Sequence, residues 1–276
     1  MPKVYVSGAL LDEAEAKVSV FDHGLVVGDG VFETILLHDG AAFALGRHLD
    51  RLERSARGLG IAAPPRAVVA DAVAQTIAAS GRRSGRIRIT VTAGRGPLGS
   101  GREKSEPTLV VAIADLGEVH DVADVVTVPY RRNEFGALTG LKTTSYGENA
   151  LALAKAAELG AEEAILSNTS GMLCEGTGSN VFVVLDGELL TPPLSSGCLA
   201  GITRALVLES GLGREADIAF SDFSAERLDE AFLTGTLRGV SPIATIDGVA
   251  LRAAPGAMAL AAAKRYGELL AGDPEP

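Results

Sequence analysis

The sequence predicts an α+β fold with two domains and mixed or antiparallel sheets. The chain has 276 residues, and one domain usually holds about 100 to 200 residues. Strand-like segments outnumber segments with helical spacing, and Asp-Gly turns that favour hairpins join several of them. The pattern loosens between Asp115 and Asp121, which we interpret as a linker. We therefore expect domains at residues 1–117 and 118–276.

The first domain should contain strands and two helices. We expect strands at KVYVSG and RIRITVTA, a buried strand at TLVVAIA, and a hairpin in FETILLHDGAAFAL that turns at Asp39 and Gly40. Leucines from Leu45 to Leu59 follow helical spacing, and Gly58 and Gly60 should end that helix. A second helix should follow Pro65, with an inner side formed by Val68, Val69, Ala72, Val73, Thr76 and Ile77.

The second domain has its own set of elements. We expect strands at DVVTVPY, EAILS, AFLTGT and IATIDGVAL, and a hairpin in SNVFVVLDGELLTP that turns at Asp186 and Gly187. Helices should run from about Glu148 to Leu159, from about Ile202, and through the Ala-rich C-terminal segment.

Composition excludes several functions. A formal charge of -10 repels phosphate backbones and anionic lipid surfaces, so we expect no nucleic acid and no membrane as partner. The start of the chain lacks the pattern of a secretory signal, which predicts a cytoplasmic protein. Cys174 and Cys198 lack CxxC spacing and are expected to be buried, and the four histidines form no ligand pattern, so no metal is expected.

The segment GRGPLG, residues 94 to 99, matches the glycine pattern of a dinucleotide-binding turn. That turn requires a helix to begin at the third glycine, and Pro97 with the polar residues that follow predicts a loop instead. We therefore expect a glycine-rich loop here and no dinucleotide site.

Lys142 lies among small and hydroxyl residues in GALTGLKTTSYGEN, with no charged neighbour before Glu148. An isolated lysine is usually a surface cation. Loss of solvation favours the neutral amine, however, and the neutral amine can form a Schiff base. Glu175 in MLCEGTGSNVF is either a carboxylate on a surface turn or a buried acid that needs a cationic partner, such as a protonated pyridine nitrogen.

Three further segments suggest a phosphate. LAGITR at 199–204 and TGTLRGVSP at 234–242 place small and hydroxyl residues at element boundaries, where backbone N–H groups can bind an anion or simply cap a helix. Arg51 lies on one helix face with His48 and could bind a phosphate with two hydrogen bonds or form a surface ion pair. Together these features indicate an aldehyde that carries a phosphate and a ring nitrogen, which is pyridoxal 5'-phosphate.

The ordered series of motifs resembles the class IV aminotransferase family, the fold-type IV enzymes that use pyridoxal phosphate. This family includes branched-chain and D-amino acid aminotransferases and aminodeoxychorismate lyase. The similarity begins at FDHGLVVGDGVFETILLHDG, continues through RHLDRLERSA, the segment after Lys142, EGTGSNVFVV and LLTPPLSSGCLAGITRALVLE, and ends in TGTLRGVSPIATIDG. It covers nearly the whole chain.

The resemblance implies a role for each candidate residue. Lys142 would form the Schiff base and transfer protons, and Glu175 would pair with the pyridinium nitrogen. The phosphate would be held by Arg51, Ile202, Thr203, Gly235 and Thr236, the last four partly through backbone N–H groups. The resemblance also implies an N-terminal α/β sandwich, a C-terminal barrel-like domain with the cofactor between the two, a small-molecule amine substrate, and a homodimer.

The motifs favour the lyase within this family. Branched-chain aminotransferases generally carry Gly-Gly-Asn-Tyr after the lysine, whereas this chain has TTSYGEN, with its tyrosine at Tyr146. D-amino acid aminotransferases typically have an arginine where this chain has Ala93. Lyases tend to have a threonine where this chain has Thr34, which would hydrogen-bond the leaving enolpyruvyl group or its carboxylate.

We therefore expect conversion of 4-amino-4-deoxychorismate to 4-aminobenzoate and pyruvate. The first alternative is a pyridoxal phosphate-dependent aminotransferase acting on D-amino acids or branched-chain amino acids. The second is a non-catalytic protein that retains the scaffold as an interaction module. It is the weakest of the three, because Lys142, Glu175 and the phosphate elements are all present.

Overall fold

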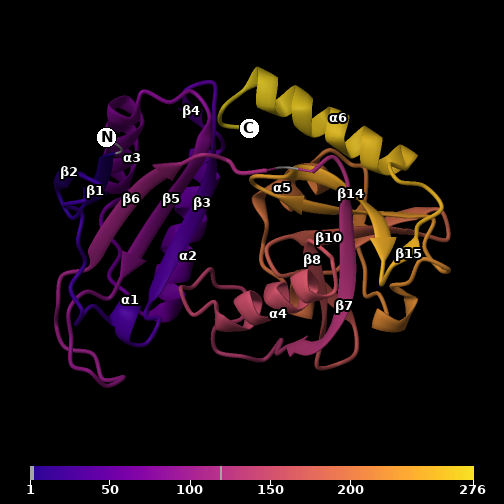
Figure 1. Ribbon diagram of the computed structural model, residues 1–276, viewed down its shortest axis with the longest axis horizontal. Helices are drawn as coiled ribbons and strands as arrows, with labels where there is room; N and C mark the ends of the chain where they lie inside the picture. Colours follow the sequence, from indigo (N-terminus) through magenta and orange to yellow (C-terminus); the bar gives the residue numbers. More distant parts are fainter. Residues whose placement is uncertain (1–2, 119) are drawn as a thin grey trace. The chain divides into compact units, whose positions relative to one another are not determined.

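The computed structural model describes residues 3–118 and 120–276. The chain divides into two compact units, one of Met1–Gly117, Leu141–Tyr146 and Asp273–Pro276, and one of Glu118–Gly140 and Gly147–Gly272. Residues 115–118 and 120–122, in the predicted linker, carry no helix or strand, and residue 119 lies outside the described residues. Figure 1 follows both units along the chain.

The first unit is built on a six-stranded antiparallel sheet with the order β2-β1-β6-β5-β3-β4. Its strands are β1 (Lys3–Val6), β2 (Ala9–Asp12), β3 (Gly30–His38), β4 (Ala41–Ala42), β5 (Gly85–Thr92) and β6 (Thr108–Ala114). Its helices are α1 (His23–Val26), α2 (Leu45–Leu59) and α3 (Arg66–Ser80). Apolar side chains of α2 and α3 pack with Val31, Ile35 and Leu37 of β3 in one core. One face of the sheet is therefore buried under the two helices.

Local signals predicted the turns of this unit well. Asp39 and Gly40 connect β3 to β4 with positive φ angles of 50° and 86°, which confirms the predicted hairpin. Gly60 ends α2 in the left-handed conformation, as predicted, whereas Gly58 lies within the helix, where the Leu141 side chain packs against it. Two further details were wrong. Val68, predicted on the inner side of α3, is 43% exposed, because the helix packs through Val69, Ala72, Val73 and Thr76. Strand β6 was predicted to be buried throughout, but only alternate residues of it are buried.

The structure corrects the predicted assignment of Lys142 to the second domain. Residues 141–146 pair with the start of β3, because Phe32 N–H donates to the carbonyl of Lys142 at 3.0 Å and Thr144 N–H donates to the carbonyl of Gly30 at 2.8 Å. Lys142 N–H also donates to the Ser55 hydroxyl of α2 at 3.1 Å. These backbone hydrogen bonds place Lys142 in the first unit.

The second unit is built on a nine-stranded mixed sheet with the path β12-β11-β10-β13-β14-β7-β8-β9, and β15 pairs with β14. Its strands are β7 (Ala123–Arg132), β8 (Glu163–Asn168), β9 (Leu173–Gly176), β10 (Asn180–Leu185), β11 (Glu188–Thr191), β12 (Arg214–Glu215), β13 (Glu230–Gly235), β14 (Gly239–Ile246) and β15 (Val249–Ala250). The β7–β8, β7–β14 and β11–β12 pairs are parallel. The sheet curls into a half-barrel, which agrees with the prediction of a barrel-like C-terminal domain (Figure 1).

Three apolar clusters hold this unit together. The largest fills the inside of the curled sheet and includes Ile165, Val183 and Leu233. A second lies between β7, β8 and helix α4 (Gly147–Glu158). A third lies between β10, β13 and helices α5 (Ile202–Glu209) and α6 (Ala257–Gly272). Strands such as β10 and β13 are thus buried on both faces, and the α+β prediction is confirmed.

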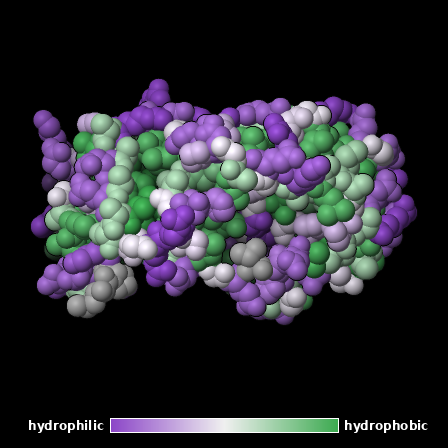
Figure 2. All heavy atoms as spheres, turned by 90° about the horizontal axis from the view of Figure 1, so that it is seen from above, coloured by the Kyte–Doolittle hydropathy of each residue, from purple (hydrophilic) through white to green (hydrophobic). Residues whose placement is uncertain are grey.

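The molecular surface is mixed in character. Hydrophobic and hydrophilic residues are interspersed over the face drawn in Figure 2. Phe135 and Leu98 are the most exposed large hydrophobic residues of the described chain, at 83% and 71%. Among residues 3–118 and 120–276, no helix has the length and apolar character needed to cross a bilayer.

Candidate active site

Lys142 lies on the sheet face opposite to α2 and α3. Side chains alternate along β3, so Phe32 points away from the face where Val31 and Ile35 pack under the helices. The Lys142 amine lies 4.3 Å from the centre of the Phe32 ring and 5.8 Å from that of Tyr146. The Tyr146 ring meets Phe32 edge to face at 5.3 Å. The two aromatic rings thus form an apolar wall beside the amine.

Arg88 adds a cation to this face. It lies opposite Thr34 in the β3–β5 register, and its guanidinium carbon is 3.4 Å from the Phe32 ring centre. Desolvation by burial lowers the pKa of Arg88 to about 10, well above neutral pH. Among the described residues, no carboxylate lies within ion-pair distance of Arg88. The Phe32 ring therefore lies beside an amine and beside a guanidinium that donates to the Thr90 hydroxyl at 3.3 Å but has no carboxylate partner among the described residues, and the two cations suit a ligand with an anionic group.

The opposite face of β3 holds a buried ion cluster. The Glu33 carboxylate accepts hydrogen bonds from Arg51 Nε at 2.8 Å and Nη2 at 2.7 Å, and His48 Nδ1 lies 2.7 Å from it. Burial alone would raise the pKa of Glu33, but the charge and hydrogen bonds of Arg51 and the hydrogen bond of His48 lower it to about 2. Burial lowers the pKa of His48 from its ordinary value. The surface ion pair considered for Arg51 is thus a buried one, and its phosphate role stays a prediction.

We expect Glu33→Gln to destabilise the protein by about 3 to 5 kcal/mol, because it leaves the Arg51 charge buried without its counterion. The Glu33 pKa is depressed in the folded state, so its stabilising effect is complete above about pH 4.5 and is lost as the pH falls towards about 2. Urea unfolding between pH 7 and pH 2.5 measures both effects. Asp50→Asn, which breaks the exposed pair between Asp50 of α2 and Arg66 of α3, should cost below about 1 kcal/mol. Equal losses in the two variants would contradict this interpretation.

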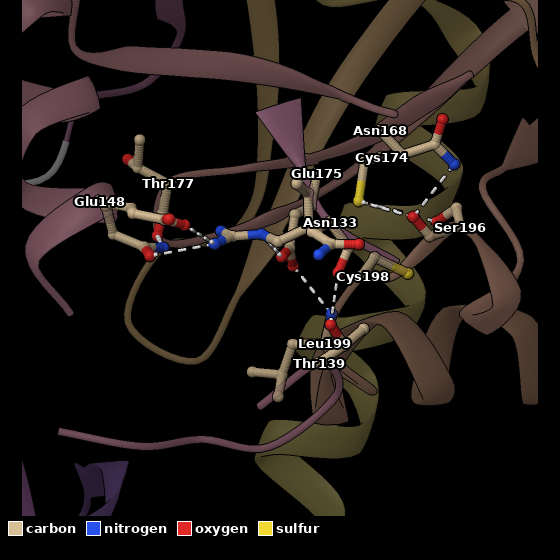
Figure 3. Close-up of polar contacts among 12 residues, drawn as sticks. Asn133, Thr139, Glu148, Asn168, Cys174, Glu175, Thr177, Ser196, Cys198 and Leu199 are labelled. Carbon is tan, nitrogen blue, oxygen red and sulfur yellow. Dashed lines mark hydrogen bonds and ion pairs between the residues drawn. The ribbon is translucent and has the colours of Figure 1, made fainter. Parts of the chain in front are cut away.

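Glu175 is the buried acid of the second unit. Its carboxylate lies 3.1 Å from Arg132 Nε and accepts the Leu199 N–H at 2.9 Å, and Figure 3 shows the contact between Glu175 and Leu199. The preceding Cys174 points to the other side of β9, where its thiol donates to the carbonyl of Ser196 at 3.3 Å. Both cysteines are buried, as predicted, and burial raises the pKa of the Cys198 thiol to about 11. Glu175 is therefore a buried acid with a cationic partner, and its role towards a pyridinium nitrogen stays a prediction.

The cationic partner of Glu175 was missed by the sequence analysis. Arg132 ends β7, its Nη1 also lies 3.5 Å from Glu148, and it donates to the side chain of Asn149 at 3.4 Å. The signal was present, because a double arginine follows an apolar strand at DVVTVPYRR. Only the parallel pairing of β7 with β8, next to β9, shows which acid it meets.

Two backbone elements near Glu175 have the geometry for an anion. Helix α5 begins after Gly201, and among the described residues no side chain caps it, so the N–H groups of its first turn, at Ile202 and Thr203, point out of the helix without a capping side chain. A side chain at Gly201 would collide with the Asn180 side chain at 1.9 Å, which explains the glycine. The other element is the turn that begins at Gly235 and Thr236 between β13 and β14.

The structure brings the candidate residues together in two groups. The first unit carries Lys142, Arg51 and Thr34, with Thr34 and Lys142 on one sheet face and Arg51 under the helices. In the second unit, Leu199 connects Glu175 to the start of α5, and the Gly178 carbonyl lies near Gly235. The second group is Glu175, Ile202, Thr203, Gly235 and Thr236.

Comparison with protein families identifies relatives over most of the chain. A family model described as amino-transferase class IV matches residues 30–246. A putative branched-chain-amino-acid aminotransferase of Methanocaldococcus jannaschii is 38% identical over 256 residues, which cover 89% of this chain and 88% of the relative. A D-alanine aminotransferase of Bacillus licheniformis is 31% identical over 266 residues, 92% of each chain. An aminodeoxychorismate lyase of Bacillus subtilis is 28% identical over 257 residues, 89% of this chain and 87% of the relative.

Solved structures with the same fold are also similar. A branched-chain aminotransferase of Thermoproteus uzoniensis with norvaline superposes with a TM-score of 0.91 and is 32% identical, covering 98% of this chain and 95% of that one. A branched-chain amino acid aminotransferase from T.th., complexed with N-(5'-phosphopyridoxyl)-L-glutamate, has a TM-score of 0.90 and 29% identity, covering 98% and 94%.

Proposed function

The chain belongs to the class IV aminotransferase family, and we propose that it transfers amino groups between branched-chain amino acids and 2-oxo acids. The cofactor of this family is pyridoxal 5'-phosphate. The choice of substrate is supported by the order of similarity, 38% to a putative branched-chain enzyme, 31% to a D-alanine enzyme and 28% to a lyase. The lyase expected from the motifs therefore becomes the second candidate.

The residues of both groups fit this cofactor. The uncapped start of α5 and the turn at Gly235 and Thr236 offer N–H groups for a phosphate. Glu175 offers a buried carboxylate for the ring nitrogen, and Lys142 offers an amine for the aldehyde. A phosphate role for Arg51 has less structural support, because its guanidinium is bonded to Glu33 under the helices. We retain these roles as proposals, together with the homodimer and the cytoplasmic location.

The chemistry divides between the cofactor and the chain. Pyridoxal phosphate, when bound, supplies an aldehyde that captures amines and a ring that withdraws electrons from the substrate carbon. The Lys142 amine would accept the proton that the substrate carbon loses and would donate a proton back later in the same transfer. The phenyl face of Phe32 keeps water away from the amine, and Arg88 binds the substrate carboxylate.

The observation that supports this proposal most directly is that the Lys142 amine and the Arg88 guanidinium lie beside the same Phe32 ring. An amine and an arginine without a carboxylate partner lie 4.3 Å and 3.4 Å from the same ring centre. An amino acid presents the two complementary groups, an amine to be exchanged and a carboxylate to be bound. The arrangement therefore supports a reaction at the α-carbon of an amino acid.

The second candidate, the lyase, has one structural observation in its favour. Thr34 lies opposite Arg88 in the strand register, so its hydroxyl is on the same sheet face as the candidate carboxylate site. 4-Amino-4-deoxychorismate carries carboxylates that both groups would hydrogen-bond. Loss of its enolpyruvyl group gives pyruvate and leaves the aromatic ring of 4-aminobenzoate.

A substrate panel on the purified, cofactor-loaded protein tests the proposal. L-valine with 2-oxoglutarate should give glutamate, and isobutylamine, which is valine without its carboxylate, should have a kcat/KM lower by at least about 100-fold. D-alanine and 4-amino-4-deoxychorismate complete the panel. Turnover of D-alanine without L-valine would overturn the choice of substrate. Release of pyruvate and 4-aminobenzoate without any transamination would establish the lyase instead.

A further inference from the structure

Glu163 is a buried carboxylate to which the reaction described above assigns no role. It begins β8, is 1% exposed, and lies in the second unit. A buried acid costs free energy unless its oxygens are fully hydrogen-bonded or paired with a cation. Its partners therefore indicate what the fold gains from keeping it.

Both carboxylate oxygens of Glu163 accept hydrogen bonds from the turn that follows Glu175. Its Oε1 accepts the Thr177 backbone N–H at 2.9 Å and the Thr177 hydroxyl, and its Oε2 accepts the Ser179 hydroxyl at 2.9 Å. A side chain at Gly176 would meet Ser179 at 2.4 Å and Glu163 at 3.1 Å, so the turn packs closely on this acid. Residues 176–179 are thus fixed to Glu163 on both sides of its carboxylate.

The same carboxylate reaches the turn between β13 and β14. Arg238 Nη2 donates to Glu163 Oε2 at 3.2 Å. Arg238 also packs on Gly235, where an added Cβ would lie 3.4 Å from its Cγ and 3.5 Å from the Gly178 carbonyl. The two turns are therefore neighbours, and Glu163 is bonded to both.

We propose that Glu163 is a positioning residue that holds the 176–179 turn and the 235–238 turn in one arrangement, so that Glu175 and the phosphate-binding backbone act on a single cofactor. This inference rests on the proposed function for the identity of that cofactor. Glu163 itself touches neither the ring nor the phosphate in this role. It acts through Thr177, Ser179 and Arg238.

The hydrogen bonds explain why a carboxylate is required. Thr177 N–H on one side and Arg238 on the other can only donate, so each needs an acceptor oxygen. A glutamine has one oxygen and one NH₂, and either orientation sets a donor against a donor. Glu163→Gln should therefore release one of the two turns while keeping the shape of the side chain.

Cofactor affinity is the first measurement. In the full chain, Glu163→Gln should weaken binding of pyridoxal 5'-phosphate by about 10-fold or more, and binding of pyridoxal, which lacks the phosphate, by below about 3-fold. Arg238→Met should show the same preference with a smaller loss. The double variant Glu163→Gln/Arg238→Met should bind pyridoxal 5'-phosphate more tightly than Glu163→Gln alone. The second substitution removes the arginine, which can only donate, so the glutamine oxygen is free to accept from the other turn. Glu162→Gln, the exposed neighbour that accepts the Asp124 N–H, is the matched control and should bind as the wild type does.

Amide hydrogen exchange of the full chain without cofactor is the second measurement. Peptides covering 175–179 and 234–239 should both exchange faster in Glu163→Gln than in the wild type. Any of three results would overturn the proposal. Glu163→Gln could bind pyridoxal 5'-phosphate as tightly as the wild type does, or it could lose the same affinity for pyridoxal as for the phosphate form. It could also leave amide exchange in both peptides unchanged. If the wild-type chain binds no pyridoxal phosphate, the proposed function is wrong. The exchange data would still show whether Glu163 holds the two turns together. If Glu163→Gln does not fold, Arg238→Met alone decides by the same two measurements.

Discussion

Lys142→Ala is expected to lower the rate of amino-group transfer by at least about 10³-fold, because it removes both the amine that captures the aldehyde and the base that moves the proton. The side chain should be dispensable for folding. Its backbone makes the hydrogen bonds to Phe32 and Ser55, and alanine retains these. Thermal unfolding should therefore differ little between the variant and the wild type, while single-turnover kinetics with L-valine should show the loss.

A covalent readout separates this role from a merely structural one. Borohydride reduction of the cofactor-loaded wild type should fix the cofactor on the peptide that contains Lys142, as detected by mass spectrometry. Lys155→Ala, which removes an exposed lysine of α4 paired with Glu158, should leave both the labelling and the rate unchanged. Labelling of a different lysine, or above about 1% of wild-type turnover in Lys142→Ala, would remove the central residue of the proposed reaction.

Turns and helix ends were predictable because their signals are local. Asp186 and Gly187 connect β10 to β11 with φ angles of 51° and 80°, a conformation that Asp-Gly adopts at little cost. Gly201 and Gly60 likewise mark the start of α5 and the end of α2. In each case, one or two residues contain the whole physical reason for the structure.

Long-range pairing was the part that the sequence could not supply. Nothing near Lys142 indicates that its backbone will pair with β3, so the domain boundary alone assigned it to the wrong unit. Glu33 lies in the strand segment VFETILL, where a charged residue usually faces solvent, and its partners on α2 become visible only when the helix is packed. The same limit applies to Glu163 and Arg238.

The motifs identified the family better than the reaction within it. Thr34 and Tyr146 led the sequence analysis towards the lyase, yet relatives with higher identity are aminotransferases. Schiff-base, phosphate and ring-nitrogen contacts are common to the whole family, so their motifs carry no information about the substrate. The proposed substrate contact of Arg88 depends on the surroundings of a single side chain, which short motifs do not describe.

Glu175→Gln is expected to lower the rate of transfer by about 10² to 10³-fold, because an amide no longer offers the negative charge that keeps a pyridine nitrogen protonated. The shape of the side chain is preserved, and the amide oxygen can still accept the Leu199 N–H, while Arg132, which the amide NH₂ would then face, keeps Glu148 as a carboxylate partner at the exposed edge of the site. Cofactor binding should therefore persist, with the loss seen mainly in kcat. The absorption spectrum of the bound cofactor, which depends on protonation of its ring nitrogen, should shift together with the rate.

Arg132 provides the control for this prediction, because it contacts two carboxylates. Its Nε lies 3.1 Å from the buried Glu175, and its Nη1 lies 3.5 Å from Glu148, whose side chain is 83% exposed. Glu148→Gln removes the same charge from the same arginine but leaves the buried acid in place, so its rate should stay within about 2-fold of wild type. A Glu175→Gln variant that matches Glu148→Gln in rate and spectrum would show that Glu175 serves Arg132 alone, and the ring nitrogen would then need a different partner.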